Sequence, residues 1–402
     1  MHNPEYLLHV SEGAEAISET LHQYIVKRMV ESMMLRIGRG ESYLLTAKDK
    51  WWIETLQQAG YLLEDIQKEI AKVTKLQQTE IAEAMEEAGV KSLEYDNEIY
   101  RSVGLEPLPL HHSPELIRIA QRNYEATMGE FRNFTRTMAL QSQQLFIKEC
   151  DRAYNLVATG ALSYSEAVKE VINNIVSDGV TVTYPSGHTD TIETATLRAV
   201  RTGISQMSAQ ITDARMEEMN WDIILVSSHL GARVTDKEDY TNHYWWQGKF
   251  YSKSGADPRF PPYSDCGFGK VQGIHGSNCR HSHGPGNGIH NPFKDYDSEE
   301  NRKMYEKQQR QRTLERRIRD TKREVMGLKE SVDNCTDTKA KFELDLQYQK
   351  KAALLAKQNK AYQQYCKDNN LKPLADRIQI AKWDRRQAAA ASGAAKRYEN
   401  AK

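Results

Sequence analysis

The chain has 402 residues, and its 55 lysines and arginines are balanced by 55 aspartates and glutamates. This length predicts two or three domains. No stretch approaches the roughly 18 to 20 consecutive apolar residues of a membrane helix, and the first residues lack the basic start and apolar run of a secretory signal. We therefore expect a soluble protein that is made in a cytoplasm and has no membrane segment.

Residues 1–160 are predicted to be helical, because their apolar residues recur at spacings of three and four. A break at residues 104–109 precedes the serine, proline and glutamate of residues 113–115. This triplet is typical of a helix start, with an N-cap, a first-turn proline and an acid that favours the helix dipole. Long helices of modest apolar content bury little surface alone, so we expect this domain to dock on a partner or on itself.

Residues 161–295 are predicted to form a small mixed α/β module. Ser163 and Glu166 have the spacing of a capping box ahead of a helix, and residues 221–228 (WDIILVSS) have the pattern of a buried strand. Residues 255–292 contain 13 glycines and prolines, too many for regular helix or sheet. We therefore expect something other than backbone ladders to hold this loop.

Residues 296–402 are predicted to form a basic helical hairpin. Residues 301–402 carry a net charge of +13, whereas residues 1–300 carry −13. This asymmetry indicates contact with nucleic acid or with an acidic protein surface through the tail. The predicted fold class is α+β and mostly α, with a helical N-terminal half, the central module and the basic tail as consecutive domains.

The tail contains an i, i+3/i+4 row of four arginines, namely Arg312, Arg316, Arg319 and Arg323. Such a row neutralises phosphates, and phosphate contacts carry no sequence information, so we expect nonspecific binding to duplex DNA. The alternative is a solvated coiled-coil face, or docking on an acidic protein.

Histidine and cysteine concentrate in the Gly/Pro-rich region, where six of the 12 histidines and two of the five cysteines lie between residues 229 and 290. Five scattered cysteines do not form a disulfide framework, so free thiols or a metal site are expected. Imidazole and thiolate suit tetrahedral zinc. The candidate zinc ligands are His275, Cys279, His281 and Cys266, but their spacing matches no standard zinc finger. We favour the interpretation in which they are polar loop residues making ordinary hydrogen bonds, so that no cofactor is expected.

A second candidate site lies just before this loop, with a hairpin predicted to turn at residues 247–248. Its residues are His229, Arg233, His243, Trp246 and Gly248. An enzymatic interpretation makes His229 or His243 a general base and lets Arg233 hold an anion. We favour the alternative, in which the tryptophans form a small core and Arg233 and the histidines hydrogen-bond the loop shut, because no nucleophile can be paired with a base.

Four sequence segments together resemble the phage minor capsid protein 2 family. They are NPEYLL at residues 3–8, HLGAR at 229–233, HYWWQGKFYS at 243–252 and NCRHSHGPG at 278–286, the last of which contains Arg280. More distantly, the central segment resembles phage Mu F-like head morphogenesis proteins. The resemblance implies a structural protein of tailed-phage heads, made in the bacterial host, packaged in a few copies at the portal vertex and located in the virion.

The resemblance and the charge pattern lead to one functional hypothesis. We expect a non-enzymatic minor head protein, present in multiple copies, that binds the portal and major capsid proteins and packaged double-stranded DNA during assembly or genome delivery. The alternative is a phage-delivered enzyme, either an ADP-ribosyltransferase-like toxin, a fold that the Mu F-like resemblance implies, or a His/Cys metal-dependent nuclease. The central segment has no Glu-x-Glu pair that would serve the transferase reaction.

Overall fold

The computed structural model describes residues 1–178, 180–184 and 186–401, and it confirms the mostly-α α+β fold class, with 69% helix and two small sheets. The α-helices are α1 (Pro4–His9), α2 (Glu12–Ile37), α3 (Glu41–Leu44), α4 (Lys48–Arg101), α5 (Pro114–Ala158), α6 (Tyr164–Asp178), α7 (Ile192–Glu218), α8 (His243–Trp246), α9 (Ser298–Asn334), α10 (Thr338–Asp368) and α11 (Arg385–Asn400). The short 3₁₀ helices are η1 (Leu110–His112), η2 (Tyr263–Cys266) and η3 (Asp376–Ile378). None of the described helices is long and apolar enough to cross a membrane.

The chain divides into two compact units whose segments alternate along the sequence. Unit 1 consists of residues 1–15, 75–132 and 194–309, and unit 2 of residues 16–74, 133–193 and 310–402. These units do not coincide with the predicted consecutive domains 1–160, 161–295 and 296–402. The predicted boundaries do lie near helix ends, at Ala158 and Ser298, but α2, α4, α5, α7 and α9 each contribute residues to both units.

Helix boundaries follow local chemistry that is visible in the sequence. The Ser163 backbone N–H donates to the Glu166 carboxylate at 3.0 Å, and the Glu166 N–H donates to Ser163 Oγ at 3.4 Å, so the predicted capping box at the start of α6 is confirmed. Ser113 Oγ likewise accepts the Leu116 N–H at the start of α5. Asp337 caps α10 by accepting the Ala340 N–H at 2.8 Å.

Unit 1 contains a three-stranded antiparallel sheet with β3 (Ile223–Val226) between β4 (Phe250–Ser252) and β5 (His283–Pro285). The buried strand predicted within residues 221–228 is therefore confirmed. The predicted hairpin is wrong in one respect, because residues 243–246 form the single-turn helix α8 and extended pairing begins only at Phe250. Gly248 makes the turn between α8 and β4 with φ of +65°, a conformation that favours glycine.

The core of unit 1 lies against β3. Trp246 is fully buried there and packs with Tyr251, Tyr263, Cys266 and Ile274. The Trp246 indole N–H donates to the Tyr240 carbonyl at 3.1 Å, and its own carbonyl accepts the Tyr251 hydroxyl at 2.7 Å. The predicted aromatic core is thus present, and residues of the Gly/Pro-rich loop pack into it.

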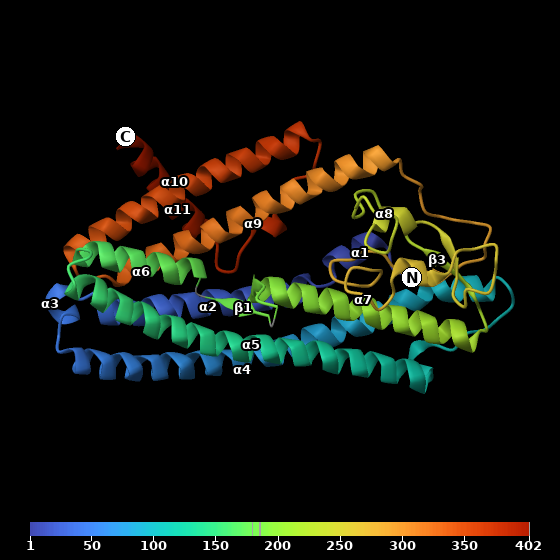
Figure 1. Ribbon diagram of the computed structural model, residues 1–402, viewed down its shortest axis with the longest axis horizontal. Helices are drawn as coiled ribbons and strands as arrows, with labels where there is room; N and C mark the ends of the chain where they lie inside the picture. The colour runs from blue at the N-terminus through green and yellow to red at the C-terminus, as the bar shows by residue number, and fades with distance from the viewer. Residues whose placement is uncertain (179, 185, 402) are drawn as a thin grey trace. The chain divides into compact units, whose positions relative to one another are not determined.

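Within its described residues, unit 2 has helices and one antiparallel pair of strands, β1 (Thr181–Thr183) and β2 (Thr189–Thr191). Helix α10 packs against both α6 and α11 (Figure 1). The alanine-rich α11 approaches α10 closely because it buries only small side chains, namely Ala391, Ala394 and Ala395. Tyr164 joins α6 to the end of α2, since its hydroxyl donates to the Ile37 carbonyl and accepts the Gly40 N–H.

All five cysteines are free thiols, and all are buried. Burial raises the pKa of each thiol, because a thiolate loses its hydration when it leaves water. The five residues are Cys150, Cys266, Cys279, Cys335 and Cys366.

Gly273→Ala is predicted to loosen the Gly/Pro-rich loop. A Cβ at residue 273 would lie 2.0 Å from the Gly267 carbonyl oxygen, so the backbone must shift, at a cost of about 1–3 kcal/mol. Gly60→Ala in α4 is the control, because its Cβ meets nothing within 4 Å and alanine favours a helix by about 1 kcal/mol. Thermal unfolding and proteolysis within residues 255–292 measure the difference. A Gly273→Ala protein as stable and as protease-resistant as wild type would contradict the prediction.

Candidate functional site

The segment after β3 is held in place by side chains from other parts of unit 1. Asn301 of α9 is fully buried, and its Oδ1 accepts the backbone N–H groups of Gly231 and Ala232 at 2.8 and 3.0 Å. Its Nδ2 donates to the Ala232 carbonyl at 3.1 Å. This reciprocal contact fixes the HLGAR segment, in which Gly231 has φ of +78°.

Arg233 closes the Gly/Pro-rich loop. Its two Nη atoms donate to the carbonyls of Gln272 and Ser277 at 3.2 and 3.1 Å. Both hydrogen bonds go to backbone carbonyls of the loop. This agrees with the favoured interpretation, in which Arg233 holds the loop closed, rather than with the enzymatic interpretation, in which Arg233 binds an anion.

Three buried side chains lie close together in this loop region: His243 from α8, and Cys279 and His281 from the segment directly before β5. Their ligand atoms all lie within 4.8 Å of one another. Cys279 Sγ is 3.6 Å from His281 Nδ1. Among the described residues, this is the group of histidine, cysteine and carboxylate side chains arranged closely enough to hold a metal ion.

Burial sets the protonation of this His/Cys group. It lowers the pKa of His243 to about 3, with Arg233 adding to the effect, and it lowers the pKa of His281 well below its usual range. Both imidazoles are therefore neutral near pH 7. A neutral imidazole is a metal ligand, but a base with a pKa near 3 is poorly matched to proton abstraction at neutral pH.

The other two predicted metal ligands lie outside the His/Cys group. His275, which has φ of +59°, places Nδ1 2.8 Å from Ser205 Oγ and Nε2 2.8 Å from His283 Nδ1. His283 in turn lies 3.4 Å from Asp213 Oδ1, and Cys266 belongs to the apolar core around Trp246. The predicted set is thus split, and His243 stands beside Cys279 and His281 instead.

A cavity of about 330 Å³ opens next to the His/Cys group. His229 and Arg280 line it, together with Tyr296 and Gln308. Arg280 Nη2 lies 3.2 Å from His229 Nδ1, and the His229 ring stacks on His281 at 4.5 Å. Of the central-motif residues, His229 and Arg280 line the cavity, while His229, His243 and Trp246 pack against the His281 ring.

The arginine row of α9 is not one exposed face. Arg316 is exposed, Arg312 and Arg319 are half-buried, and Arg323 is only 5% exposed. Arg319 donates to the Arg377 carbonyl. The prediction that Arg323 contacts DNA disagrees with its burial, because α2 and the first turn of α7 cover α9 at that position.

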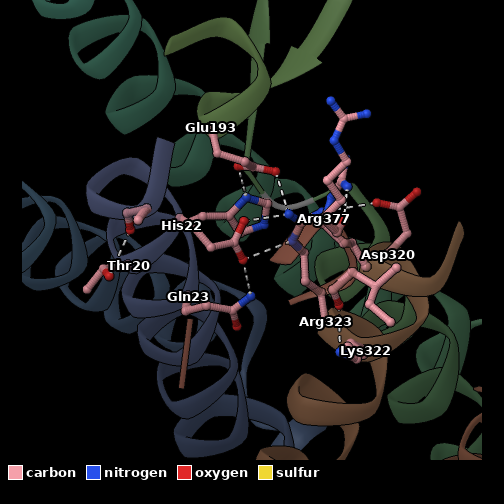
Figure 2. Close-up of polar contacts among 12 residues, drawn as sticks. Thr20, His22, Gln23, Glu193, Asp320, Lys322, Arg323 and Arg377 are labelled. Carbon is pink, nitrogen blue, oxygen red and sulfur yellow. Dashed lines mark hydrogen bonds and ion pairs between the residues drawn. The ribbon is translucent and has the colours of Figure 1, made fainter. Parts of the chain in front are cut away.

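Arg323 is the centre of a buried charge cluster (Figure 2). Its guanidinium lies 2.5 Å from Glu19 Oε2 of α2 and 2.6 Å from Glu193 Oε1 of α7, and it also pairs with Asp320. His22 Nδ1 is 2.9 Å from Glu193 Oε2. Burial raises the pKa of Glu193, but the attraction of Arg323 and His22 outweighs it and lowers the pKa below its usual value.

Sequence reasoning missed the polar residues that orient the site. Gln247 Oε1 accepts the His229 backbone N–H at 3.0 Å and lies 3.0 Å from His281 Nε2, and the Gln272 carbonyl lies 2.8 Å from His243 Nε2. Asn301 was missed as well. An isolated Asn or Gln side chain forms no recognisable spacing pattern in a sequence. The one indication for Gln247 was its position directly after the HYWW segment.

Comparison with known proteins gives one match. The family described as phage minor capsid protein 2 matches residues 2–363, which is nearly the whole chain. Searches of curated proteins and of solved structures find no significant match.

Arg323→Gln is predicted to destabilise the protein by about 3–5 kcal/mol, because it leaves Glu19 and Glu193 buried without their cation. Arg316→Gln removes the same charge from an exposed position of the same helix and is expected to change stability by less than about 0.5 kcal/mol. Chemical denaturation followed by circular dichroism compares the two. Equal stability of both variants would show that Arg323 does not serve as the counter-charge of this cluster.

Proposed function

The chain belongs to the phage minor capsid protein 2 family, and on this premise we propose that it binds the portal and major capsid proteins and contacts packaged double-stranded DNA through its C-terminal helices. As a member of this family it is a structural phage capsid protein, located in the virion and associated with other capsid components. The finer assignment is supported by the distribution of exposed charged and apolar side chains in unit 2.

The observation that carries the DNA proposal is the surface charge of residues 310–401. Six acidic side chains are exposed there, namely Asp320, Asp333, Asp368, Asp376, Asp384 and Glu399. Fifteen basic side chains are exposed, namely Arg310, Arg316, Arg317, Lys339, Lys341, Lys350, Lys357, Lys360, Lys367, Lys372, Lys382, Arg385, Arg386, Lys396 and Arg397. The excess of cations thus remains at the surface although Arg323 is buried. Such a surface attracts phosphates through counterion release and reads no base sequence.

The observation that supports docking is an apolar row on the first turns of α4. Trp52, Ile53 and Leu56 are 40%, 58% and 44% exposed, while Trp51 beside them is buried. Neighbouring exposed apolar side chains of this size mark protein interaction surfaces. In a member of a capsid family, we assign this row to another head protein, with the portal as the partner to be tested first.

Ile53→Gln with Leu56→Gln is predicted to abolish co-purification with portal protein without unfolding the chain, because both side chains already contact water. The control is Phe342→Gln in α10, an exposed apolar residue outside the row. The measurement is co-expression with portal and major capsid proteins followed by size-exclusion chromatography. Undiminished binding of the double variant to portal would contradict the assignment.

For DNA, we expect the full chain to bind duplexes of unrelated sequence equally, with log affinity falling linearly against log salt at a slope of about −0.9 per phosphate neutralised. Arg310→Gln, Arg316→Gln and Arg317→Gln together should reduce the steepness of this slope by up to about 3. The matched control removes three exposed charges from α4 by Lys48→Gln, Lys50→Gln and Lys68→Gln.

Fluorescence anisotropy at three salt concentrations gives these slopes. Identical slopes for the two triple variants would remove α9 from the DNA-contact surface, and no binding at low salt would overturn the DNA proposal. Because the proposal contains no nuclease step, plasmid incubated with the protein and divalent metal should stay intact.

A further inference from the structure

The His/Cys group of His243, Cys279 and His281 carries an inference that is independent of DNA or portal binding. The three residues are 3%, 2% and 1% exposed. They come from α8 and from the segment that leads into β5, which lie 36 to 38 residues apart in sequence. Side chains brought together over such a distance and buried at one point need a physical reason for their convergence.

Each imidazole is oriented by an oxygen at Nε2. The oxygen facing His281 is Gln247 Oε1, which also accepts the His229 N–H, so it is an acceptor and the His281 ring donates. The oxygen facing His243 is the backbone carbonyl of Gln272. A neutral imidazole that donates from Nε2 keeps a lone pair on Nδ1. This arrangement, in which an outer acceptor fixes the tautomer, is the one found around metal-ligating histidines.

The sulfur is oriented in a corresponding way. Cys279 Sγ accepts the backbone N–H of His281 at 3.4 Å and lies 3.6 Å from His281 Nδ1. On tetrahedral zinc, with bonds of about 2.3 Å to sulfur and about 2.05 Å to nitrogen, a thiolate and an imidazole nitrogen are separated by about 3.6 Å. The Cys279 and His281 ligand atoms therefore already have the spacing that zinc requires.

A simple S–H···N hydrogen bond accounts for the Cys279–His281 pair, but it does not involve His243, whose ring lies 5.3 Å from that of His281. A cation between the three ligand atoms accounts for all of them and satisfies the sulfur as a thiolate. Sulfur and nitrogen donors in this number favour zinc over magnesium or calcium, which prefer oxygen.

We propose that unit 1 binds one zinc ion through Cys279 Sγ, His243 Nδ1 and His281 Nδ1, with a water molecule at the fourth position. The ion connects α8 to the segment before β5 and so fixes one part of the Gly/Pro-rich loop. Arg233 fixes another part through its hydrogen bonds to the carbonyls of Gln272 and Ser277. The role is structural, and it adds a fixed point to the part of the loop that precedes the β5 ladder.

The test uses the full chain, stripped of metal by a chelator and titrated with Co²⁺ as a spectroscopic substitute for zinc. We expect about one Co²⁺ per chain, with the visible bands of a tetrahedral ion and a near-ultraviolet thiolate-to-cobalt charge-transfer band, both lost on addition of Zn²⁺. Zn²⁺ should raise the thermal midpoint, whereas Mg²⁺ should not. A wild-type protein that binds no stoichiometric Co²⁺, or binds it without the thiolate band, would overturn the proposal.

The variants separate this ligand set from the one predicted from sequence. Cys279→Ser should lose the charge-transfer band, and His243→Gln should lose tight binding. Cys266→Ser, which changes another buried cysteine of the same loop, should keep both. Gln247→Leu should weaken zinc affinity by about 10- to 100-fold through loss of its hold on His281.

A folded Cys266→Ser variant that no longer binds metal would overturn the assignment in favour of the set containing Cys266. A Cys279→Ser variant that retains the thiolate band would overturn it equally. If Cys279→Ser does not fold, the wild-type spectrum alone decides whether a thiolate is a ligand.

Discussion

The Gly/Pro-rich segment of residues 255–292 cannot hold itself, and much of unit 1 is arranged around this constraint. Only its last part, β5, pairs with β3, so most of its backbone polar groups find partners in turns and side chains. Arg233 donates to two carbonyls of the loop, and Asn301 fixes the segment directly before Arg233. Trp246 packs against the buried loop residues Cys266 and Ile274. The loop thus combines turn hydrogen bonds of its own backbone, such as Ile274 N–H to the Cys266 carbonyl, with side-chain contacts from outside it.

Unit 2 differs in that some of its arginines are buried with carboxylates and others are exposed to solvent. Arg323 neutralises Glu19 and Glu193 where α2, α7 and α9 meet, whereas Arg316 and Arg317, one to two turns earlier in α9, are exposed. Two carboxylates buried without a cation would be far more costly than the same groups in water. Arginines of one helix thus differ in environment, and the packing of neighbouring helices decides which are buried with carboxylates and which are exposed.

The sequence predicts local features well because their causes are local. The Ser163–Glu166 capping box and the buried strand ending at Val226 depend on residues within a few positions of one another. The grouping of His243 with Cys279 and His281 does not follow from spacing, because the chain reverses between His275 and Cys279, with φ of +59° at His275 and +60° at Asn278. Residues close in sequence therefore point apart, and His243 arrives from a distant helix. The burial of Arg323 is unpredictable for the same reason, since α2 and α7 supply its partners.

The burial of all five cysteines bears on what happens to the protein after the host cell lyses. Inside the bacterium thiols are kept reduced, but a released virion meets dissolved oxygen with no reductant to repair it. Oxidation proceeds through the thiolate and needs access, and burial here withholds both by raising each thiol pKa and excluding solvent. A folded chain therefore presents no exposed thiol for disulfide exchange with its surroundings.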